Sequence, residues 1–311
     1  MSQLTPIEIG LTTAIVAVTD DEPQVLVAGE TGKKDKPAGL PSGAFDPLSH
    51  RTFEIGLREW VTAQTALDIV YVEQLYTFGD RGRQARAGDP HVVSVGYLAL
   101  TRVPENVQGL REAGASFQPW YRFFPWEDWR DGRPSIIDGA IVPALTKWAR
   151  GVAGRNERLR LCFGDDAVWD EEKVLERYEL LYEAGLIEEV LRDGRVEQVR
   201  GHLGESMRLD HRRILATAIA RLRGKLKYRP VVFELMPAEF TLTELQRTVE
   251  AISGRHLHKQ NFRRLVEGTE LVEPTGEMAT ATGGRPAALF RFRRAVMQER
   301  HAPGLRLGVR R

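Results

Sequence analysis

Basic and amide side chains are concentrated on one short segment in the C-terminal third of the chain. Six of the seven residues in this segment are of these types: His258, Lys259, Gln260, Asn261, Arg263 and Arg264. Arginine and lysine bind phosphate oxygens and the edge of guanine, while asparagine and glutamine can read adenine. The segment therefore has the chemistry of a DNA-reading surface, although a charge-rich helix can also simply face solvent.

Two short helices and a tight turn are predicted to position this surface. Thr241 and Glu244 have the spacing of a capping box, and Gly254 follows the apolar repeat as a stop signal. A second helix is predicted over about residues 257–267, and a basic amphipathic helix over 210–226 precedes the pair. Two helices joined by a turn that contains glycine are typical of a helix-turn-helix.

A hairpin is predicted after this pair, with residues 271–274 facing 288–292. Helices followed by such a hairpin form a winged helix-turn-helix, whose second helix enters the major groove of DNA. Arg285, near the tip of the hairpin, is expected to touch the DNA backbone. The alternative is a winged helix that binds protein.

The charge distribution favours DNA over protein as the partner. Residues 1–200 carry 23 Lys and Arg against 32 Asp and Glu, whereas residues 201–311 carry 21 against 11. A basic domain behind an acidic one is expected when only one of them faces a polyanion.

The acidic N-terminal part has the pattern of an α/β (α+β) domain. Strands are predicted at 11–18, 24–28, 70–76 and 92–100, with a helix at 51–66, and a helix pair at 169–191 is expected to break near Gly185. The aromatic segment 116–148 is interpreted as core or as a dimer contact, and less readily as a cofactor cage.

Several functional classes are excluded because their motifs are absent. The chain has no Walker A, GxGxxG or GxSxG motif and no clustered Cys and His spacing, so we expect no catalytic residues, no metal and no required cofactor. No apolar run is long enough to cross a membrane, and no signal peptide is recognised. The single Cys162 fits a cytoplasmic protein.

The sequence around Arg58, Glu59 and Trp60 resembles a degenerate Nudix box. Aligned on these residues, His50 replaces the first Glu of the box, and Thr62 and Ala63 replace its Glu pair. Magnesium chemistry needs oxygen ligands with charge, so the resemblance implies a domain that binds a nucleotide without cleaving it. We expect Arg58 and Glu59 to form an ion pair that orients the loop after Gly43. Catalysis through a rearranged metal site is the alternative.

A set of longer motifs makes the resemblance more specific. They are residues 75–80 (LYTFGD), 93–100 (VSVGYLAL), 228–235 (YRPVVFEL), 240–246 (FTLTELQ), 261–264 (NFRR) and 284–287 (GRPA). With them the chain resembles the Nudix-related transcriptional regulators of NAD metabolism, the NrtR family. The middle segment 121–129 (YRFFPWEDW) resembles the longer, NadQ-type branch.

The resemblance implies a homodimeric repressor of NAD biosynthesis genes that binds a palindromic operator in double-stranded DNA. Its effector is expected to be ADP-ribose, NAD or a related nucleotide. Effector contacts are expected between the box helix and the loop after Tyr76; besides Arg58 and Glu59 they are Lys36, Phe78, Arg81 and Arg83. The alternative for Arg81 and Arg83 is that they simply face solvent on a surface loop. A Nudix hydrolase of ADP-ribose is the main rival function, and a protein-binding scaffold is the second.

The expected architecture is a Nudix-like domain, a helical linker and a winged helix-turn-helix. The predicted boundaries are residues 1–150 for the effector-sensing domain, 151–205 for the linker, and 206–311 for the DNA-binding domain with its basic tail.

Overall fold

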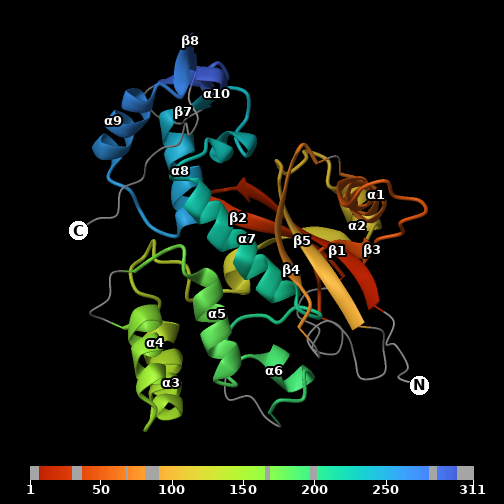
Figure 1. Ribbon diagram of the computed structural model, residues 1–311. Helices are drawn as coiled ribbons and strands as arrows, with labels where there is room; N and C mark the ends of the chain where they lie inside the picture. The colour runs from red at the N-terminus through yellow and green to blue at the C-terminus, as the bar shows by residue number, and fades with distance from the viewer. Residues whose placement is uncertain are drawn as a thin grey trace.

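A mixed β-sheet forms the N-terminal part of the protein (Figure 1). The structure is a computed structural model that describes residues 7–29, 37–67, 69–80, 91–164, 169–196, 202–279 and 286–299. The strand order is β4-β5-β1-β2-β6, and β3 pairs with β1. β1 and β5 run parallel, and the other pairs are antiparallel. The strands are β1 (Ile7–Thr19), β2 (Glu22–Ala28), β3 (Ser42–Ala44), β4 (Tyr71–Phe78), β5 (His91–Leu100) and β6 (Ala115–Pro119).

The predicted N-terminal hairpin and box helix are both present. Val16 pairs with Val25 across the hairpin, and the chain reverses through Asp20 and Asp21, whose φ angles are 50° and 59°. Aspartate tolerates this left-handed conformation better than most residues. The box helix is α1 (Phe53–Thr65), which begins where the Thr52 side chain accepts a hydrogen bond from the Ile55 amide.

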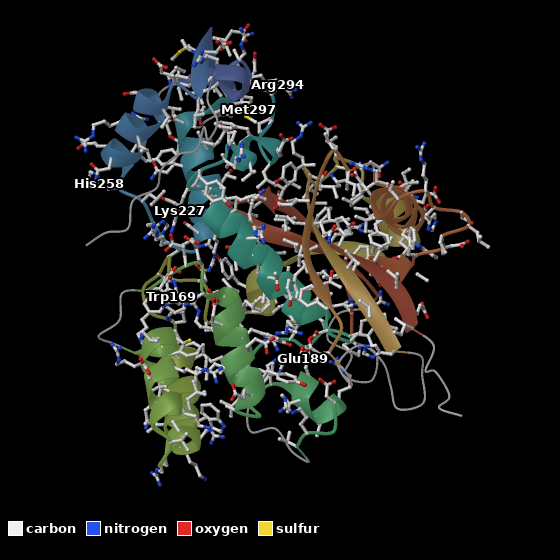
Figure 2. All side chains as sticks on the ribbon, in the orientation of Figure 1. Trp169, Glu189, Lys227, His258, Arg294 and Met297 are labelled. Carbon is white, nitrogen blue, oxygen red and sulfur yellow. The ribbon has the colours of Figure 1, made fainter. Side chains whose placement is uncertain are left out.

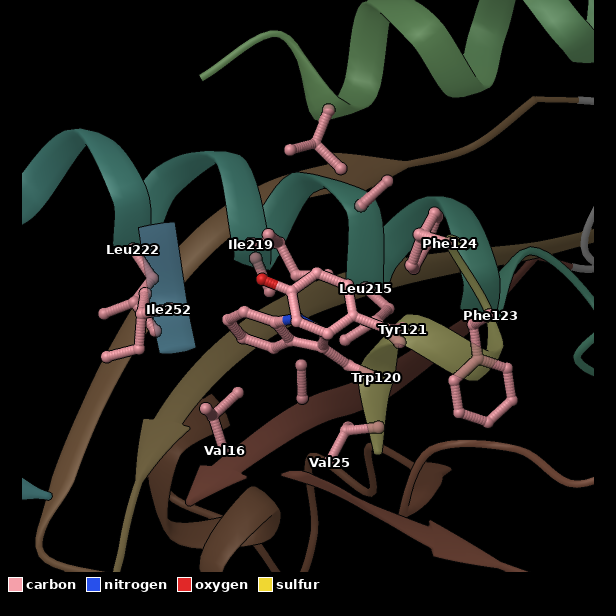
Figure 3. Packing of buried hydrophobic residues seen from close by; sticks show 14 of the residues in the cluster. Val16, Val25, Trp120, Tyr121, Phe123, Phe124, Leu215, Ile219, Leu222 and Ile252 are labelled. Atoms are coloured by element: carbon pink, nitrogen blue, oxygen red, sulfur yellow. The ribbon is translucent and has the colours of Figure 1, made fainter. Parts of the chain in front are cut away.

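Helices cover both faces of the sheet. Leu11 and Ile15 of β1 pack with α1 and α2 (Gln108–Glu112), while Ala14 and Val16 face the long helix α7 (His211–Lys225) on the other side. Figure 3 shows Leu215, Ile219 and Leu222 of α7 over the sheet. A strand buried on both faces has an unbroken apolar run, which explains why residues 11–18 are almost all apolar.

The aromatic segment is part of this core. Trp120, Phe124 and Trp126 are fully buried, and Tyr121 is 9% exposed. This confirms the core interpretation over a cofactor cage. Trp120 and Tyr121 pack under α7, beside Ile252 of the C-terminal domain (Figure 3).

A helical region connects the sheet to α7. A π-helical turn (Ile137–Ile141) leads into α3 (Val142–Ala149) and α4 (Ala153–Phe163), and α5 (Val174–Glu183) and α6 (Glu188–Arg192) follow. The predicted break at Gly185 separates α5 from α6, because this glycine has a φ of 74°.

The C-terminal domain is a winged helix, as predicted. α8 (Leu242–Ser253) and α9 (Lys259–Thr269) form the helix-turn-helix, and α10 (Val296–Glu299) follows the wing. The wing strands β8 (Val272–Ala279) and β9 (Ala287–Phe292) are joined by the short β7 (Phe240–Thr241) in the order β7-β9-β8.

The predicted basic amphipathic helix over 210–226 is present as α7, but two of its arginines do not lie on a polar outer face. Arg212 and Arg223 are 0% and 1% exposed, and each is surrounded by acceptors from neighbouring segments. Helical periodicity reports which residues are apolar, but it cannot reveal that a charged side chain is buried by tertiary partners.

No helix in the part of the chain that the structure describes is long and apolar enough to span a membrane.

Candidate nucleic-acid interface and sensor site

Side-chain hydrogen bonds hold the start of α8 and the turn between α8 and α9. The Thr241 amide donates to Oε2 of Glu244 at 2.6 Å, and the Glu244 amide donates to Oγ1 of Thr241 at 3.2 Å. Gly254 ends α8 with a φ of 72°. Beyond it, the Leu257 amide donates to the carboxylate of Glu250 at 2.7 Å. The capping box fixes the start of α8, and the contacts at Gly254 and Leu257 set the direction in which α9 leaves the turn.

α9 separates its apolar and polar residues cleanly. Phe262 and Val266 are 2% and 0% exposed and fix the helix to the domain. His258 lies at the outer edge of the molecule (Figure 2). All six predicted DNA-binding residues of this segment are exposed: His258, Lys259, Gln260, Asn261, Arg263 and Arg264.

The cations of α9 are available for an external partner. Lys259, Arg263 and Arg264 form no ion pair with any carboxylate of the described ranges. In the wing, Pro274 pairs with Phe290, as predicted. Arg285, which is predicted to contact the DNA backbone, lies outside the described residues. An exposed helix of unpaired cations and amides can bind phosphate and base edges.

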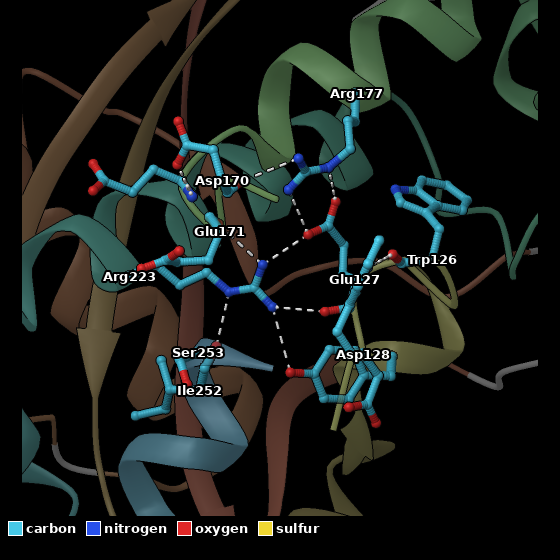
Figure 4. A network of polar contacts seen from close by, with 12 residues as sticks. Trp126, Glu127, Asp128, Asp170, Glu171, Arg177, Arg223, Ile252 and Ser253 are labelled. Carbon is cyan, nitrogen blue, oxygen red and sulfur yellow. Dashed lines mark hydrogen bonds and ion pairs between the residues drawn. The ribbon is translucent and has the colours of Figure 1, made fainter. Parts of the chain in front are cut away.

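A buried ionic cluster joins the winged helix to the rest of the protein (Figure 4). Glu127 is fully buried and accepts from Nε and Nη2 of Arg177 at 2.6 and 2.9 Å. It also accepts from Nη1 of Arg223 at 2.7 Å. Arg223 in turn donates to the carbonyl of Ile252 at 2.8 Å, and Trp129 donates through its amide to the carbonyl of Gly254 at 2.7 Å.

This cluster connects four segments of the chain. Glu127 belongs to the aromatic segment, Arg177 to α5, Arg223 to α7, and Ile252 to α8. The prediction of core for residues 116–148 did not single out Glu127. The segment has four acidic residues, and the sequence does not show that Glu127 is the one buried against cations.

The residues of the degenerate Nudix box make structural contacts with one another. His50 is 8% exposed, its Nε2 lies 3.2 Å from Oε2 of Glu59, and its Nδ1 accepts from the Asp46 amide. A Cβ added at Gly43 would lie 2.1 Å from the ring of Trp60, which requires glycine there. Trp60 donates to the carbonyl of Ala44 at 2.8 Å. His50 therefore takes part in holding the loop before α1.

Two predictions about the sensor residues need correction. Arg58 pairs with Glu54 at 2.8 Å, one helical turn away, while Glu59 contacts His50, so Arg58 and Glu59 do not pair with each other. Phe78 is 1% exposed beneath Arg213, so its ring is in the core and not available to stack on a nucleotide. Side chains four apart on a helix face each other, whereas adjacent ones do not.

The structure does not describe the remaining predicted effector residues. Lys36, Arg81 and Arg83 lie outside the described residues. Within the described part, no group of three or more His, Cys, Asp and Glu side chains is arranged to hold a metal ion.

Sequence reasoning also missed Arg208, which precedes α7 and borders a cavity of about 410 Å³ beside α1 and β3. An arginine in a loop carries no periodic signal, so only the tertiary structure shows its position.

Comparison with known proteins agrees with this architecture. Residues 232–292 match the NrtR DNA-binding winged helix domain. An ADPR responsive transcriptional repressor NtrR of Acinetobacter baylyi is 46% identical over 83 residues, which are 27% of this chain. The match spans 33% of that curated relative, well under two thirds of its length.

Two solved structures share the fold over nearly the whole chain. NrtR of Shewanella oneidensis, solved with a 27mer DNA, covers 91% of this chain and 93% of its own, with a TM-score of 0.54 and 20% identity. A MutT/nudix family protein of Enterococcus faecalis covers 93% of this chain and 89% of its own, with a TM-score of 0.56 and 16% identity. These two likenesses concern the fold alone.

Proposed function

We propose that this NrtR-type protein, whose C-terminal domain belongs to the NrtR winged helix family, is a transcriptional repressor of NAD biosynthesis genes. The observation that carries the proposal is the exposed face of α9, where unpaired cations and amides stand on a helix-turn-helix. A relative that is 46% identical over 83 residues is a transcriptional repressor, which supports the same role here.

The effector of the Nudix-like domain is ADP-ribose or a related nucleotide. The response of the Acinetobacter baylyi relative to ADPR supports ADP-ribose over NAD. An effector shifts the repressor only if it binds the DNA-free and DNA-bound conformations with different affinities.

The Nudix-like domain binds its nucleotide without hydrolysing it. His50, Thr62 and Ala63 stand where the box needs carboxylates, and His50 is engaged with Glu59 and Asp46. Magnesium prefers several oxygen ligands in octahedral geometry, which these side chains do not supply. No cofactor is required for this role.

The working form is a cytoplasmic homodimer that binds a palindromic operator. A two-fold symmetric dimer presents two α9 helices about one helical turn of DNA apart, so the operator symmetry follows the protein symmetry. Light scattering with and without an operator duplex measures this stoichiometry.

A gel-shift titration tests the proposal. Promoter regions of the organism's NAD biosynthesis genes are used at two salt concentrations, with NAD, ADP-ribose, ATP and nicotinic acid added in turn. A specific complex that weakens steeply with salt and is changed by ADP-ribose is expected, because phosphate contacts release counterions. Absence of a complex with every promoter would contradict the repressor role.

The rival function is a Nudix hydrolase of ADP-ribose. It predicts Mg²⁺-dependent turnover, so incubation of the purified chain with ADP-ribose and Mg²⁺ should leave the nucleotide intact if the proposal is right. A protein-binding scaffold, the second rival, predicts no salt-dependent affinity for duplex DNA.

A further inference from the structure

Arg208 is a partly buried cation with no counterion among the described residues. None of the ion pairs formed by the described residues includes it, and its Nε has no hydrogen-bond partner. Its Nη2 donates only to neutral oxygens, the carbonyl of Leu40 at 3.1 Å and Oγ of Ser42 at 3.4 Å. Burial lowers the pKa of its guanidinium from the ordinary value. Burying a charge without a partner is unfavourable, so an external anion would stabilise this arrangement.

The cavity beside Arg208 is suited to an anion. It measures about 410 Å³, which lies within the range of about 300 to 1,000 Å³ typical of small-molecule pockets. Arg208 is the one charged residue among the described residues that line it. The others are Ala28, Gly29, Ser42, Gln64, Ala113, Gly114 and Leu209. No carboxylate is among these described lining residues, so the charge that they present to a ligand is the positive charge of Arg208.

The cavity lies within the Nudix-like domain, close to the box. Ser42 begins β3, and Gln64 lies in the last turn of α1, with its Nε2 donating to the carbonyl of Ser42 at 2.6 Å. Arg208 passes so close to Gly39 that a Cβ there would lie 2.1 Å from Nε. The glycine thus allows the arginine to reach the cavity.

Arg208 is also joined to the helix that leads to the DNA-binding domain. Its amide donates to the carbonyl of Ala38 at 3.0 Å, and three residues later His211, the first residue of α7, accepts at Nδ1 from the Leu40 amide at 2.9 Å. At the other end of α7, Arg223 donates to the carbonyl of Ile252 in α8. A helix of this length spans about 22 Å.

We infer that Arg208 binds a phosphate group of the nucleotide effector in this cavity, and that α7 relays the occupancy of the cavity to the helix-turn-helix. The inference rests on the proposed sensing of a nucleotide and assigns the anion-binding residue to that function. A guanidinium offers planar donors that match phosphate, and Nη1 of Arg208 is not buried and donates to no acceptor among the described residues.

Isothermal titration of ADP-ribose into the full-length chain tests the contact. Arg208→Gln should weaken binding at least tenfold, and Arg208→Lys should weaken it less, because lysine keeps the charge but loses the paired donors. Arg150→Gln, at an exposed arginine that ends α3, is the matched control and should bind like the wild type. Unchanged affinity in Arg208→Gln would overturn the inference.

Fluorescence anisotropy of a labelled operator duplex tests the relay. Arg208→Gln should bind the duplex with wild-type affinity and should not respond to ADP-ribose at concentrations that change the wild-type complex. Thermal unfolding serves as the check on folding: the melting temperature of Arg208→Gln should be no lower than that of the wild type, since the variant removes an uncompensated charge. A large loss of melting temperature would assign Arg208 a structural role and overturn the inference.

A second variant changes another residue that lines the cavity. Ala113 is exposed, follows α2 and has an ordinary φ of −77°, so Ala113→Gln should fold normally and obstruct the cavity. It should weaken ADP-ribose binding while Arg208 is intact. Wild-type affinity in this variant would place the nucleotide elsewhere.

Failure of the proposed effector can be distinguished from failure of the site. If the wild type does not bind ADP-ribose, melting temperatures are measured with inorganic phosphate, AMP, ATP and NAD. If a phosphate compound raises the melting temperature of the wild type but not that of Arg208→Gln, the anion site is supported. Only the identity of the effector then changes. No rise with any of these phosphates, or an equal rise in both proteins, overturns the site itself.

Discussion

Arg263 and Arg264 of α9 carry the strongest prediction about single residues. Both are exposed and unpaired with carboxylates of the described residues, so their replacement by Ala should leave the fold intact and abolish specific operator binding. If both contact phosphate in each protomer of the proposed dimer, four contacts are lost and the slope of log affinity against log salt should fall by about 4. Anisotropy titrations at several salt concentrations measure both effects, with circular dichroism as the check on folding. Retained operator affinity would mean that α9 is not the recognition helix.

His211 gives a prediction about pH. It is fully buried and accepts a hydrogen bond at Nδ1, and burial, followed by the positive charges of Arg208 and Arg192, holds its pKa well below 6.5. The unfolded chain takes up a proton below pH 6.5 and the folded chain does not, so protonation favours unfolding. Stability should fall as the pH decreases below about 6.5, by at most about 1.4 kcal/mol per pH unit from this residue.

Urea unfolding at pH 7.5, 6.5 and 5.5 measures this dependence. His211→Gln removes the titrating group and should show a weaker loss of stability between pH 6.5 and 5.5 than the wild type. Equal losses in the two proteins would assign the pH dependence to other groups.

At the residue scale, the exposure of a side chain could be predicted from the sequence better than its interaction partners. The polar face of α9 was evident because Phe262 and Val266 fix the orientation of the helix. The partners of Arg58 and Glu59 could not be predicted from the sequence. An ion pair depends on side-chain rotamers and on tertiary neighbours, and here the loop before α1 places His50 beside Glu59. Phe78 was misjudged because β4 lies beneath α7, and the strand pattern does not show which face is covered.

At the scale of elements, Glu127 connects α5, α7 and the end of α8. Glu127→Gln removes the negative charge shared by Arg177 and Arg223 and leaves two buried cations. Breaking such a buried cluster typically costs about 3 to 5 kcal/mol. Urea denaturation should show this loss of unfolding free energy, and the effector response of DNA binding should weaken along with it.

An exposed pair supplies the control for this change. Arg158 and Glu183 pair on the surface between α4 and α5, and Glu183→Gln should cost less than about 1 kcal/mol. If Glu127→Gln costs no more than this surface change, the cluster does not couple the helices.

Elements with strong local signals were predicted with nearly correct bounds. The capping box at Thr241 and the stop at Gly254 define α8 within the chain itself, and the glycine at 185 separates α5 from α6. Buried Arg212 and Arg223 were missed because their acceptors are carbonyls and carboxylates from distant segments, such as Phe123 and Ile252. Such partners become neighbours only after the sheet, α5 and α8 have packed around α7.

At the scale of the whole molecule, coupling between the two ligands must be reciprocal. If ADP-ribose lowers the affinity of the protein for operator DNA by some factor, operator DNA lowers the affinity for ADP-ribose by the same factor. Titration of ADP-ribose into free and operator-bound protein should give this equality. Unequal factors would indicate a further linked equilibrium, such as a change in oligomeric state.

The three-part division at residues 150 and 205 and the homodimer stay predictions. Size measurements in solution test the homodimer, and limited proteolysis tests the boundaries.

The hydrophobic cluster shared by the sheet, α7 and α8 has a consequence for the modularity of this protein. Val16 of the sheet, Ile219 of α7 and Ile252 of α8 belong to one cluster, so the winged helix shares its interior with the sensor. A fragment that began after α7 would expose Ile252 and lose the donor that Arg223 supplies. A chimera with another regulator's winged helix would therefore need to inherit α7 with its junction. A functional domain swap should therefore transfer the DNA-binding domain together with α7.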